Sequence, residues 1–256
     1  GRRVKAIGAG HSFTAAAATD GVLVDLDELD RVVRVDAERC QVTVQAGIRL
    51  HRLKEDLARV GLALPNLGDI DRQSIAGAIS TATHGTGLHF GNLATTVVGM
   101  ELVDGGGDVV RCSATEEPDV WRVARVGLGA VGIVTEVTLQ CVEAFNLHAR
   151  ETVEPVATVL ERFAAEAAAV DHFELYLMPG GRRCQVKRNA RTDAPASPPG
   201  RWAYTRDKLL MENVGFGAVC RVGRRFPALA PRIAHLVASA ASERGLIDRS
   251  DRVFTS

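Results

Sequence analysis

The stretch that most constrains the fold lies near the start of the chain and reads Ile7-Gly8-Ala9-Gly10-His11-Ser12-Phe13. It follows a short strand predicted over Val4–Ile7, and its glycines lack the Cβ that would keep the backbone away from another molecule. Consecutive amides in such a turn can point inward and form a nest for an anion such as a pyrophosphate. We therefore expect a cofactor held by its phosphates beside the His11 imidazole. The alternative is a surface turn with an incidental histidine.

Composition narrows the function classes. The chain has 256 residues, of which 46% are hydrophobic and 24% charged, as in soluble globular proteins. Lys plus Arg and Asp plus Glu number 31 each, so no net field attracts nucleic acid or an anionic membrane, and we expect no nucleic-acid partner. We interpret the basic cluster Arg221–Arg225 as a solvated face. No apolar run has the length of a membrane span, and no signal peptide is visible.

The five cysteines argue against a disulfide framework and against a zinc cluster, because they are far apart, odd in number and without a CxxC pair. They favour a reducing compartment, so we expect a cytoplasmic protein. They are Cys40, Cys112, Cys141, Cys184 and Cys220.

The first half of the chain is rich in hairpins. β-branched residues and turn pairs predict a strand over Val22–Leu26 and two hairpins. Leucines spaced by three and four predict an amphipathic helix that ends at Gly61, and a second helix follows later. The predicted hairpins join 32–36 to 41–47 and 97–103 to 109–112; the helices cover 50–60 and 118–126, and a strand covers 133–139.

The run Gln73–Gly87 consists almost entirely of small residues and carries five hydroxyls. Small side chains let the backbone approach a bulky planar ligand, and the hydroxyls offer it hydrogen bonds. We predict a second ligand-binding loop here, since hydroxyls among glycines are a costly way to build a core. The alternative is tight packing of a helix on a sheet.

A literal GxGxxG lies at Gly127–Gly132, but its context excludes a nicotinamide site. A dinucleotide fingerprint has a strand before it and a helix after it. Here a helical pattern precedes the glycines and the β-rich segment Ile133–Leu139 follows them, so the order is reversed.

The second half has a different texture, with a domain boundary predicted near Val142–Asn146. Strands are predicted over 145–152 and 172–178, a helix over 155–169, a short ribbon over 184–188, a Pro-rich loop over 193–200, and helices over 208–211 and 229–241. The chain begins at Gly1 and ends in Arg252–Ser256, which we interpret as the opening of another strand. We therefore expect a fragment of a longer protein.

Among the seven histidines, only His11 and His84 lie inside glycine-rich loops. A metal site is not expected, because no histidines occur at ligand spacing with a carboxylate partner. Gly-x-Ser-x-Gly and Gly-Lys-Ser/Thr motifs are missing from the sequence, which argues against an acyl hydrolase and a P-loop. From the residues alone, we expect a ligand held by two separate small-residue loops.

Several stretches together closely resemble the vanillyl-alcohol-oxidase type FAD family, and within it the sugar-lactone oxidoreductases (L-gulono-1,4-lactone oxidase or dehydrogenase and D-arabinono-1,4-lactone oxidase). The similarity covers most of residues 3 to 142 and continues more weakly to the end. Besides Val4–Phe13, the matching stretches are Asp20-Gly21, Val42–Gly47, Gly61–Gly68, Ala82–Gly87 and Leu128–Gly132.

The resemblance implies an α+β fold. It comprises a two-subdomain FAD-binding domain over residues 1–143, truncated at its N-terminus, followed by a partial cap (substrate) domain over 144–256, truncated at its C-terminus. His11 matches the histidine that many members bond covalently to the flavin. The implied cofactor-binding set is Ala6, Ile7, Gly8, Ala9, Gly10, His11 and Ser12 around the pyrophosphate, Asp69, Ser74, Gly77, Thr81, Thr83, His84 and Gly85 along the flavin and ribityl chain, and Ile133 and Val134 beside the adenine.

Gly68 matches a position that bears on oxygen access, since Gly occurs there in oxygen-reactive members and Ala in some dehydrogenases. It leans slightly toward an oxidase. No catalytic residue is assigned, because the carboxylate and cationic residues that orient the sugar in this family belong to the missing C-terminal part.

The expected reaction is oxidation of an aldonolactone to an ascorbate-type product, with electrons passed to oxygen or to a cytochrome or quinone. An alditol oxidase on the same scaffold and a flavin-free binding module of the same fold are the alternatives. Membrane association of the full-length protein stays open.

Overall fold

The structure, a computed structural model, describes residues 2–178, 181–198, 215–229, 233 and 243–255. It divides into two compact units. Unit 1 comprises Gly1–Gly85, Phe90–Ala144 and Ser250–Ser256, and unit 2 comprises Thr86–His89 and Phe145–Arg249. The predicted second domain covers 144–256, whereas unit 2 takes Phe145–Arg249 from this range and Ser250–Ser256 belong to unit 1.

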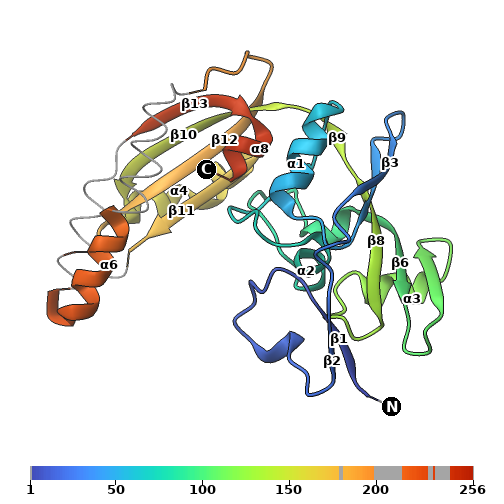
Figure 1. Cartoon of the computed structure of the whole chain (residues 1–256). Coiled ribbons are helices and arrows are strands. Elements are labelled where there is room, and N and C mark those ends of the chain that lie inside the picture. The colour runs from blue at the N-terminus through green and yellow to red at the C-terminus, as the bar shows by residue number, and fades with distance from the viewer. Residues whose placement is uncertain (1, 179–180, 199–214, 230–232, 234–242, 256) are drawn as a thin grey trace. The chain divides into compact units, whose positions relative to one another are not determined.

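Unit 1 is built on a five-stranded antiparallel sheet with the strand order β3-β4-β8-β6-β7 (Figure 1). Apolar side chains at alternate positions of the central strands are buried, among them Val42, Val44, Val137 and Leu139. Both predicted hairpins are confirmed. The strands are β3 (Val32–Asp36), β4 (Gln41–Gln45), β6 (Val97–Val103), β7 (Val109–Ser113) and β8 (Ile133–Gln140).

Three α-helices of unit 1 lie between its strands in the chain. Helix α1 (Leu50–Arg59) buries Leu50, Leu53 and Leu57, which are at most 1% exposed, so the predicted amphipathic helix is confirmed. The other two are α2 (Ile75–Ser80) and α3 (Pro118–Ala124). The GxGxxG segment lies between α3 and β8, and the reversed order of helix, glycines and strand is therefore confirmed.

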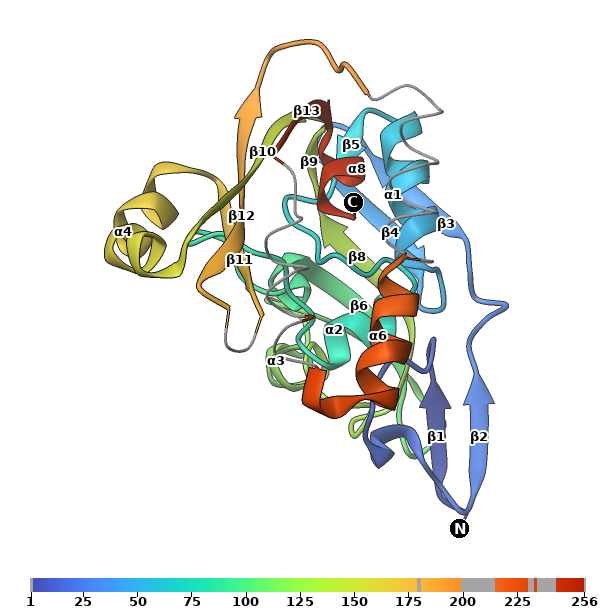
Figure 2. The same ribbon diagram turned by 90° about the vertical axis from the view of Figure 1, so that its left-hand side faces the viewer.

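Two short strand pairings also belong to unit 1. Strands β1 (Val4–Ile7) and β2 (Val22–Asp25) run parallel, as Figure 2 shows, and a 3-10 turn, η1 (Ala15–Ala17), lies between them in the chain. Strand β5 (Leu62–Ala63) pairs with β9 (Val142–Glu143) in antiparallel register. The glycine-rich stretch therefore leaves the end of β1, as predicted.

Unit 2 is a four-stranded antiparallel sheet with the order β11-β12-β10-β13. Helix α4 (Val156–Ala169) packs against one face through Val159, which joins Phe173, Cys184 and Val186 in a buried cluster. The strands are β10 (Asn146–Pro155), β11 (His172–Leu177), β12 (Arg183–Thr192) and β13 (Arg244–Arg249). Helix α6 (Phe216–Arg225) and the 3-10 turn η4 (Pro227–Leu229) also belong to this unit.

The predicted loop Gln73–Gly87 is wrong over part of its length, because it contains α2. The Ser74 hydroxyl accepts a hydrogen bond from the Gly77 amide and caps this helix, and four apolar residues at helical spacing are buried. They are Ile75, Ala76, Ala78 and Ile79. For residues 75–80 the alternative interpretation, a tightly packed helix, is therefore the right one, and an irregular segment follows it.

The strand predicted over Arg252–Ser256 is also wrong. Ser250–Phe254 form helix α8, and Ser250, Asp251, Val253 and Phe254 are buried at helical spacing. Lys54 of α1 donates to the Asp251 carbonyl at 3.2 Å, so packing inside unit 1 overrides the β propensity of Val253 and Phe254.

Other differences lie in unit 2. The predicted ribbon 184–188 is longer, and α6 and β13 were not predicted. In α6, Arg221, Arg224 and Arg225 are exposed, which confirms the solvated basic face. The helix predicted over 208–211 lies outside the described residues, as does nearly all of the one over 229–241.

Candidate cofactor site

The first loop, Gly8–Ser12, follows β1; Gly8 and Ala9 are half-buried, and Gly10, His11 and Ser12 are exposed. Within the described part of the chain, none of its five amides donates a hydrogen bond to a protein acceptor. Gly10 has a φ of +68°, a left-handed conformation that glycine adopts without strain. A turn with unbonded amides and a positive-φ glycine has the features of an anion-binding nest.

The first loop lies against the start of α2. A Cβ added at Gly8 would lie 2.3 Å from the Oγ of Ser74. Ser74 is 1% exposed, and its hydroxyl is held by the Gly77 amide at 3.3 Å. The two small-residue segments therefore meet because residue 8 has no side chain, which brings the predicted site residues Gly8, Ser74 and Gly77 together.

A second close approach brings Leu67–Gly68 beside His84–Gly85. A Cβ at Gly68 would lie 2.9 Å from the His84 carbonyl oxygen, and one at Gly85 would lie 2.2 Å from the Leu67 carbonyl oxygen. These distances are shorter than van der Waals contact. The two segments can run this close only with glycine at both positions.

One side-chain bond ties these segments together. The Nε2 of Gln73 donates to the Thr83 hydroxyl at 3.0 Å, just ahead of the Ser74 cap. Segments 8–12, 66–68, 73–77 and 83–85 thus form one continuous cluster in unit 1.

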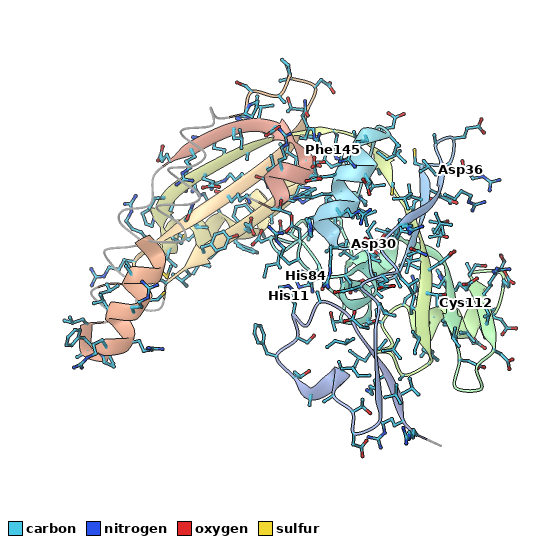
Figure 3. All side chains as sticks on the ribbon, viewed as in Figure 1. His11, Asp30, Asp36, His84, Cys112 and Phe145 are labelled. Carbon is cyan, nitrogen blue, oxygen red and sulfur yellow. The ribbon has the colours of Figure 1, made fainter. Side chains whose placement is uncertain are left out.

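The two histidines of the glycine-rich loops differ in their surroundings (Figure 3). His11 is exposed, and within the described residues its ring makes no hydrogen bond. His84 is also exposed, but its Nδ1 lies 2.8 Å from the Gly85 carbonyl oxygen. Because a carbonyl only accepts, the neutral His84 ring carries its proton on Nδ1 and keeps the Nε2 lone pair.

The remaining predicted site residues take varied positions. Ala6 and Ile7 end β1, and Asp69 is exposed beyond Gly68. The Thr81 hydroxyl donates to the Gly77 carbonyl at 2.9 Å, which closes the last turn of α2.

Ile133 and Val134 begin β8, where they pair with Val103 and Leu102 of β6. Their link to the loops runs through Ala46, which donates to the Thr135 carbonyl and accepts from the Ala76 amide.

Sequence reasoning missed two residues of the cluster, Asn66 and Gln73, and also Ala46, which links the cluster to β8. Asn66 is 6% exposed, and its Oδ1 lies 2.4 Å from where a Gly85 Cβ would be. Gln73 bonds Thr83, and Ala46 bridges β8 to α2. Asn66 stands inside a stretch that carries the family resemblance, which is the one signal that could have found it.

The cluster suits a long ligand with an anionic centre. Its donors are amides and hydroxyls, and its glycines admit close backbone approach, which is what a pyrophosphate with attached ring systems requires. The residues present therefore fit FAD. Among the described residues, no three His, Cys, Asp or Glu side chains gather in a way that could hold a metal ion.

Comparison with known proteins agrees with this geometry. Residues 1–113 match the model of the FAD binding domain, and residues 137–256 match that of D-arabinono-1,4-lactone oxidase. The predicted family resemblance is confirmed. Unit 1 thus carries nearly all of the FAD-binding match, and the lactone-oxidase match covers all of Phe145–Arg249.

Three relatives illustrate the branch. The L-gulono-1,4-lactone dehydrogenase of Mycobacterium tuberculosis is 41% identical over 256 residues, which is 100% of this chain and 59% of the relative. The L-gulonolactone oxidase of Scyliorhinus torazame is 35% identical over 255 residues, 99% of this chain and 57% of the relative. The D-arabinono-1,4-lactone oxidase of Eremothecium gossypii is 33% identical over 243 residues, 93% and 45% of the two chains. The chain therefore spans about half the length of the relatives it matches.

The fold also matches solved structures. A cholesterol oxidase from B. sterolicum superposes with a TM-score of 0.75 at 18% identity, covering 98% of this chain and 53% of the other. This likeness confirms the expected α+β fold of the family. No described helix is long and apolar enough to cross a membrane.

Proposed function

We propose that the whole protein is an FAD-dependent oxidoreductase that oxidises a sugar-1,4-lactone to an ascorbate-type product. The observation that carries the proposal is the convergence of the amide-lined first loop with Ser74, Gly77 and the 83–85 segment. The names of the three relatives support the lactone as substrate.

The chain's own residues would bind and orient. The amides of Gly8–Ser12 would hold the pyrophosphate, while Ser74, Gly77, Thr83 and His84 would line the flavin and its ribityl chain. Ile133 and Val134 would lie beside the adenine. When bound, FAD supplies the hydride acceptor for a substrate C–H next to a hydroxyl.

We extend the proposal to a covalent link between an imidazole nitrogen of His11 and the 8α carbon of the flavin. A C–H bond of the 8α methyl group would break, its proton would leave, and its two electrons would pass through the flavin to the electron acceptor named below. The exposure of His11 supports this role, as does the finding that no described residue hydrogen-bonds its ring, because the ring is then available to a ligand. Acid precipitation of the purified full-length protein tests it. Yellow colour should stay in the pellet of the wild type and move to the supernatant in His11→Ala. Colour in the wild-type supernatant would reject the link but keep the flavoenzyme.

The electron acceptor is proposed to be oxygen, or a cytochrome or quinone. The family resemblance relates Gly68 to the choice of acceptor, because glycine at this position accompanies reactivity with oxygen. Packing gives a second reason for a glycine at position 68. A Cβ there would meet the His84 carbonyl at 2.9 Å. Gly68→Ala should slow the reoxidation of the reduced flavin by oxygen. The visible spectrum of the flavin should be recorded for the same variant, because the added methyl group also forces His84 to shift.

Two rival functions are separable by experiment. An alditol oxidase would oxidise open-chain polyols faster than lactones in a substrate screen of the full-length protein. A flavin-free binding module would be colourless when purified from riboflavin-supplied cells. A colourless native protein would overturn the proposed function.

The proposed location is cytoplasmic, with membrane association left to the full-length protein. Fractionation of cells producing that protein, before and after a salt wash, would separate soluble, peripheral and anchored forms.

A further inference from the structure

Two cysteines of unit 1 lie opposite each other in the five-stranded sheet, although they are far apart in sequence. Strands β4 and β8 pair in antiparallel register, with Gln41 opposite Gln140. The next position of this register brings Cys40 opposite Cys141, and the Cys141 amide donates to the Cys40 carbonyl oxygen at 2.7 Å. Opposite residues of an antiparallel pair are the ones whose side chains interact. The fold of unit 1 thus brings two cysteines together.

The spacing of the two residues suits a disulfide. Hydrogen-bonded partners in antiparallel strands have Cα atoms about 5.5 Å apart, and disulfides most often join Cα atoms about 5.5–6 Å apart. The thiols are also near each other, because burial, and next the charge of Cys40, raise the pKa of Cys141 to about 12. A neighbouring charge has this effect mainly within about 6 Å. Both residues are free thiols in the structure.

The backbone of Cys40 is strained in a way that glycine would avoid. Residues 37–40 form the turn between β3 and β4, in which the Cys40 amide donates to the Ala37 carbonyl oxygen at 3.3 Å. Cys40 has a φ of +51°, a left-handed conformation that is unfavourable for a residue with a Cβ. Strain of this kind gathers at positions with a function. The function that a cysteine side chain can supply is the chemistry of its thiol.

The two thiols differ in access to solvent. Cys40 is half-buried, whereas Cys141 is 2% exposed. An oxidant from solvent therefore meets Cys40 first, since oxidation of cysteine follows exposure. The oxidised Cys40 would then lie beside a second thiol that is shielded from solvent.

We propose that Cys40 and Cys141 are a peroxide-sensitive pair that forms a disulfide within unit 1. Hydrogen peroxide oxidises the Cys40 thiol to a sulfenic acid and is reduced to water. The Cys141 sulfur then attacks the Cys40 sulfur, the hydroxyl group leaves with the Cys141 proton as a second water, and the S–S bond forms. In all, the two thiols lose two electrons and two protons, which the peroxide takes up.

This pair goes beyond the proposed function, although the two are compatible. An oxidase that passes its electrons to oxygen releases hydrogen peroxide, so such a reaction would itself supply the oxidant. Disulfides of proteins in a reducing compartment are usually transient and redox-sensing. The bond would join the β3–β4 turn to the end of β8 and would close a long loop, which stabilises a fold by restricting the unfolded chain.

The test treats native full-length protein with hydrogen peroxide, blocks the remaining thiols with N-ethylmaleimide and maps the peptides without reduction. Wild type should give a cross-linked pair of peptides that contain Cys40 and Cys141, and dithiothreitol should separate them. Cys40→Gly, which suits the positive φ, and Cys141→Ala should give no such pair. The matched control is Cys112→Ala, which removes another buried thiol of unit 1 and should keep the cross-link.

Urea unfolding is the second readout. Peroxide treatment should raise the urea midpoint of wild type and of Cys112→Ala, and dithiothreitol should reverse the shift. The midpoint of Cys40→Gly should not rise, because this variant cannot form the bond. An unchanged midpoint in cross-linked wild type would overturn the stabilising effect of the bond.

Oxidation of the exposed Cys220 without a cross-link between Cys40 and Cys141 would overturn the proposal, since the peroxide would then have reached the protein. A cross-link that forms as readily in urea-unfolded protein would also overturn it, because the fold would contribute nothing. If Cys141→Ala does not fold, Cys40→Gly decides. The measurement needs neither flavin nor lactone activity, so a failure of the proposed function is seen separately.

Discussion

Inside each unit, a different kind of interaction fixes the structure. In unit 1 the candidate site is built from backbone: Gly8, Gly68 and Gly85 each stand where a Cβ would clash. In unit 2 the sheet and α4 are joined by charged side chains, because Arg188 bonds Glu154 at 2.8 Å and Glu166 through its Nε at 2.8 Å.

The difference shows in the pKa of Glu154. Burial alone would raise it, but hydrogen bonds from Thr152 and Arg188 and the charge of Arg188 lower it below its usual value. Unit 1 should therefore respond to added volume, and unit 2 to removed charge. Each of the following experiments on the full-length protein probes one side of this contrast.

The largest effect should come from Gly85→Ala. Its Cβ would meet backbone at Leu67, which cannot swing aside, so we expect a loss of about 3 kcal/mol in the free energy of unfolding. Urea unfolding measures it. Gly105→Ala is the control, since nothing lies within 4 Å of a Cβ there. Equal stability of the two variants would refute the backbone account of the site.

Arg188→Met should lower the free energy of unfolding by a smaller amount. The substitution keeps an unbranched side chain but leaves Glu154 and Glu166 without this partner. The side chains are about one-fifth exposed, so we expect about 2 kcal/mol, between the values for surface and fully buried pairs. Arg122→Met, which removes an exposed pair with Asp119, should change stability by less than about 0.5 kcal/mol. Similar losses in both would break the contrast.

Acidification should lower the free energy of unfolding by a still smaller amount, through protonation of His172. Burial lowers the pKa of His172 most; the Thr86 carbonyl and Asp171 oppose this, while Arg191 and Lys187 add to it. Since the native pKa lies below the unfolded value of about 6.5, stability is full above that pH and falls as the pH drops toward the native pKa. Urea midpoints of wild type and His172→Asn should therefore converge on acidification. A constant difference would contradict this.

The smallest effect concerns thiol reactivity, which should leave the fold intact. Burial, and next the neighbouring Cys40, raise the pKa of Cys141 to about 12, and burial also raises the pKa of Cys112 and Cys184. Exposed Cys220 and half-buried Cys40 should react with iodoacetamide first. Peptide mapping after brief labelling checks the order, and early labelling of Cys141 would be the contrary result.

The sequence predicted most of what local periodicity encodes. The hairpins of unit 1, helices α1 and α4, and the reversed GxGxxG all follow from side-chain spacing and turn residues. Helix α2 was hidden because a run of small residues reads as a loop, and only its Ser74 cap and buried Ile75 and Ile79 reveal it. Helix α8 was misread because its conformation depends on Lys54, which lies far away in sequence.

The candidate site was predictable in part. Gly8 and Ser74 could be named because the resemblance covers their stretches, and the structure shows them in contact distance. Asn66 was passed over although the resemblance covers its stretch. Gln73 could not be named, since its role depends on the fold that brings Thr83 to it. The His172–Thr86 bond joins residues 86 positions apart, beyond the reach of any local pattern.

Strand pairing at the edge of unit 2 has a further consequence. Asn146 opens β10 and Arg249 closes β13, and the two are direct partners. Paired residues in an antiparallel sheet lie about 5 Å apart, so the two ends of the segment Phe145–Arg249 lie next to each other. A turn of a few residues could therefore connect residues 144 and 250 in place of this segment. The corresponding segment of a relative could likewise be inserted between the same two residues.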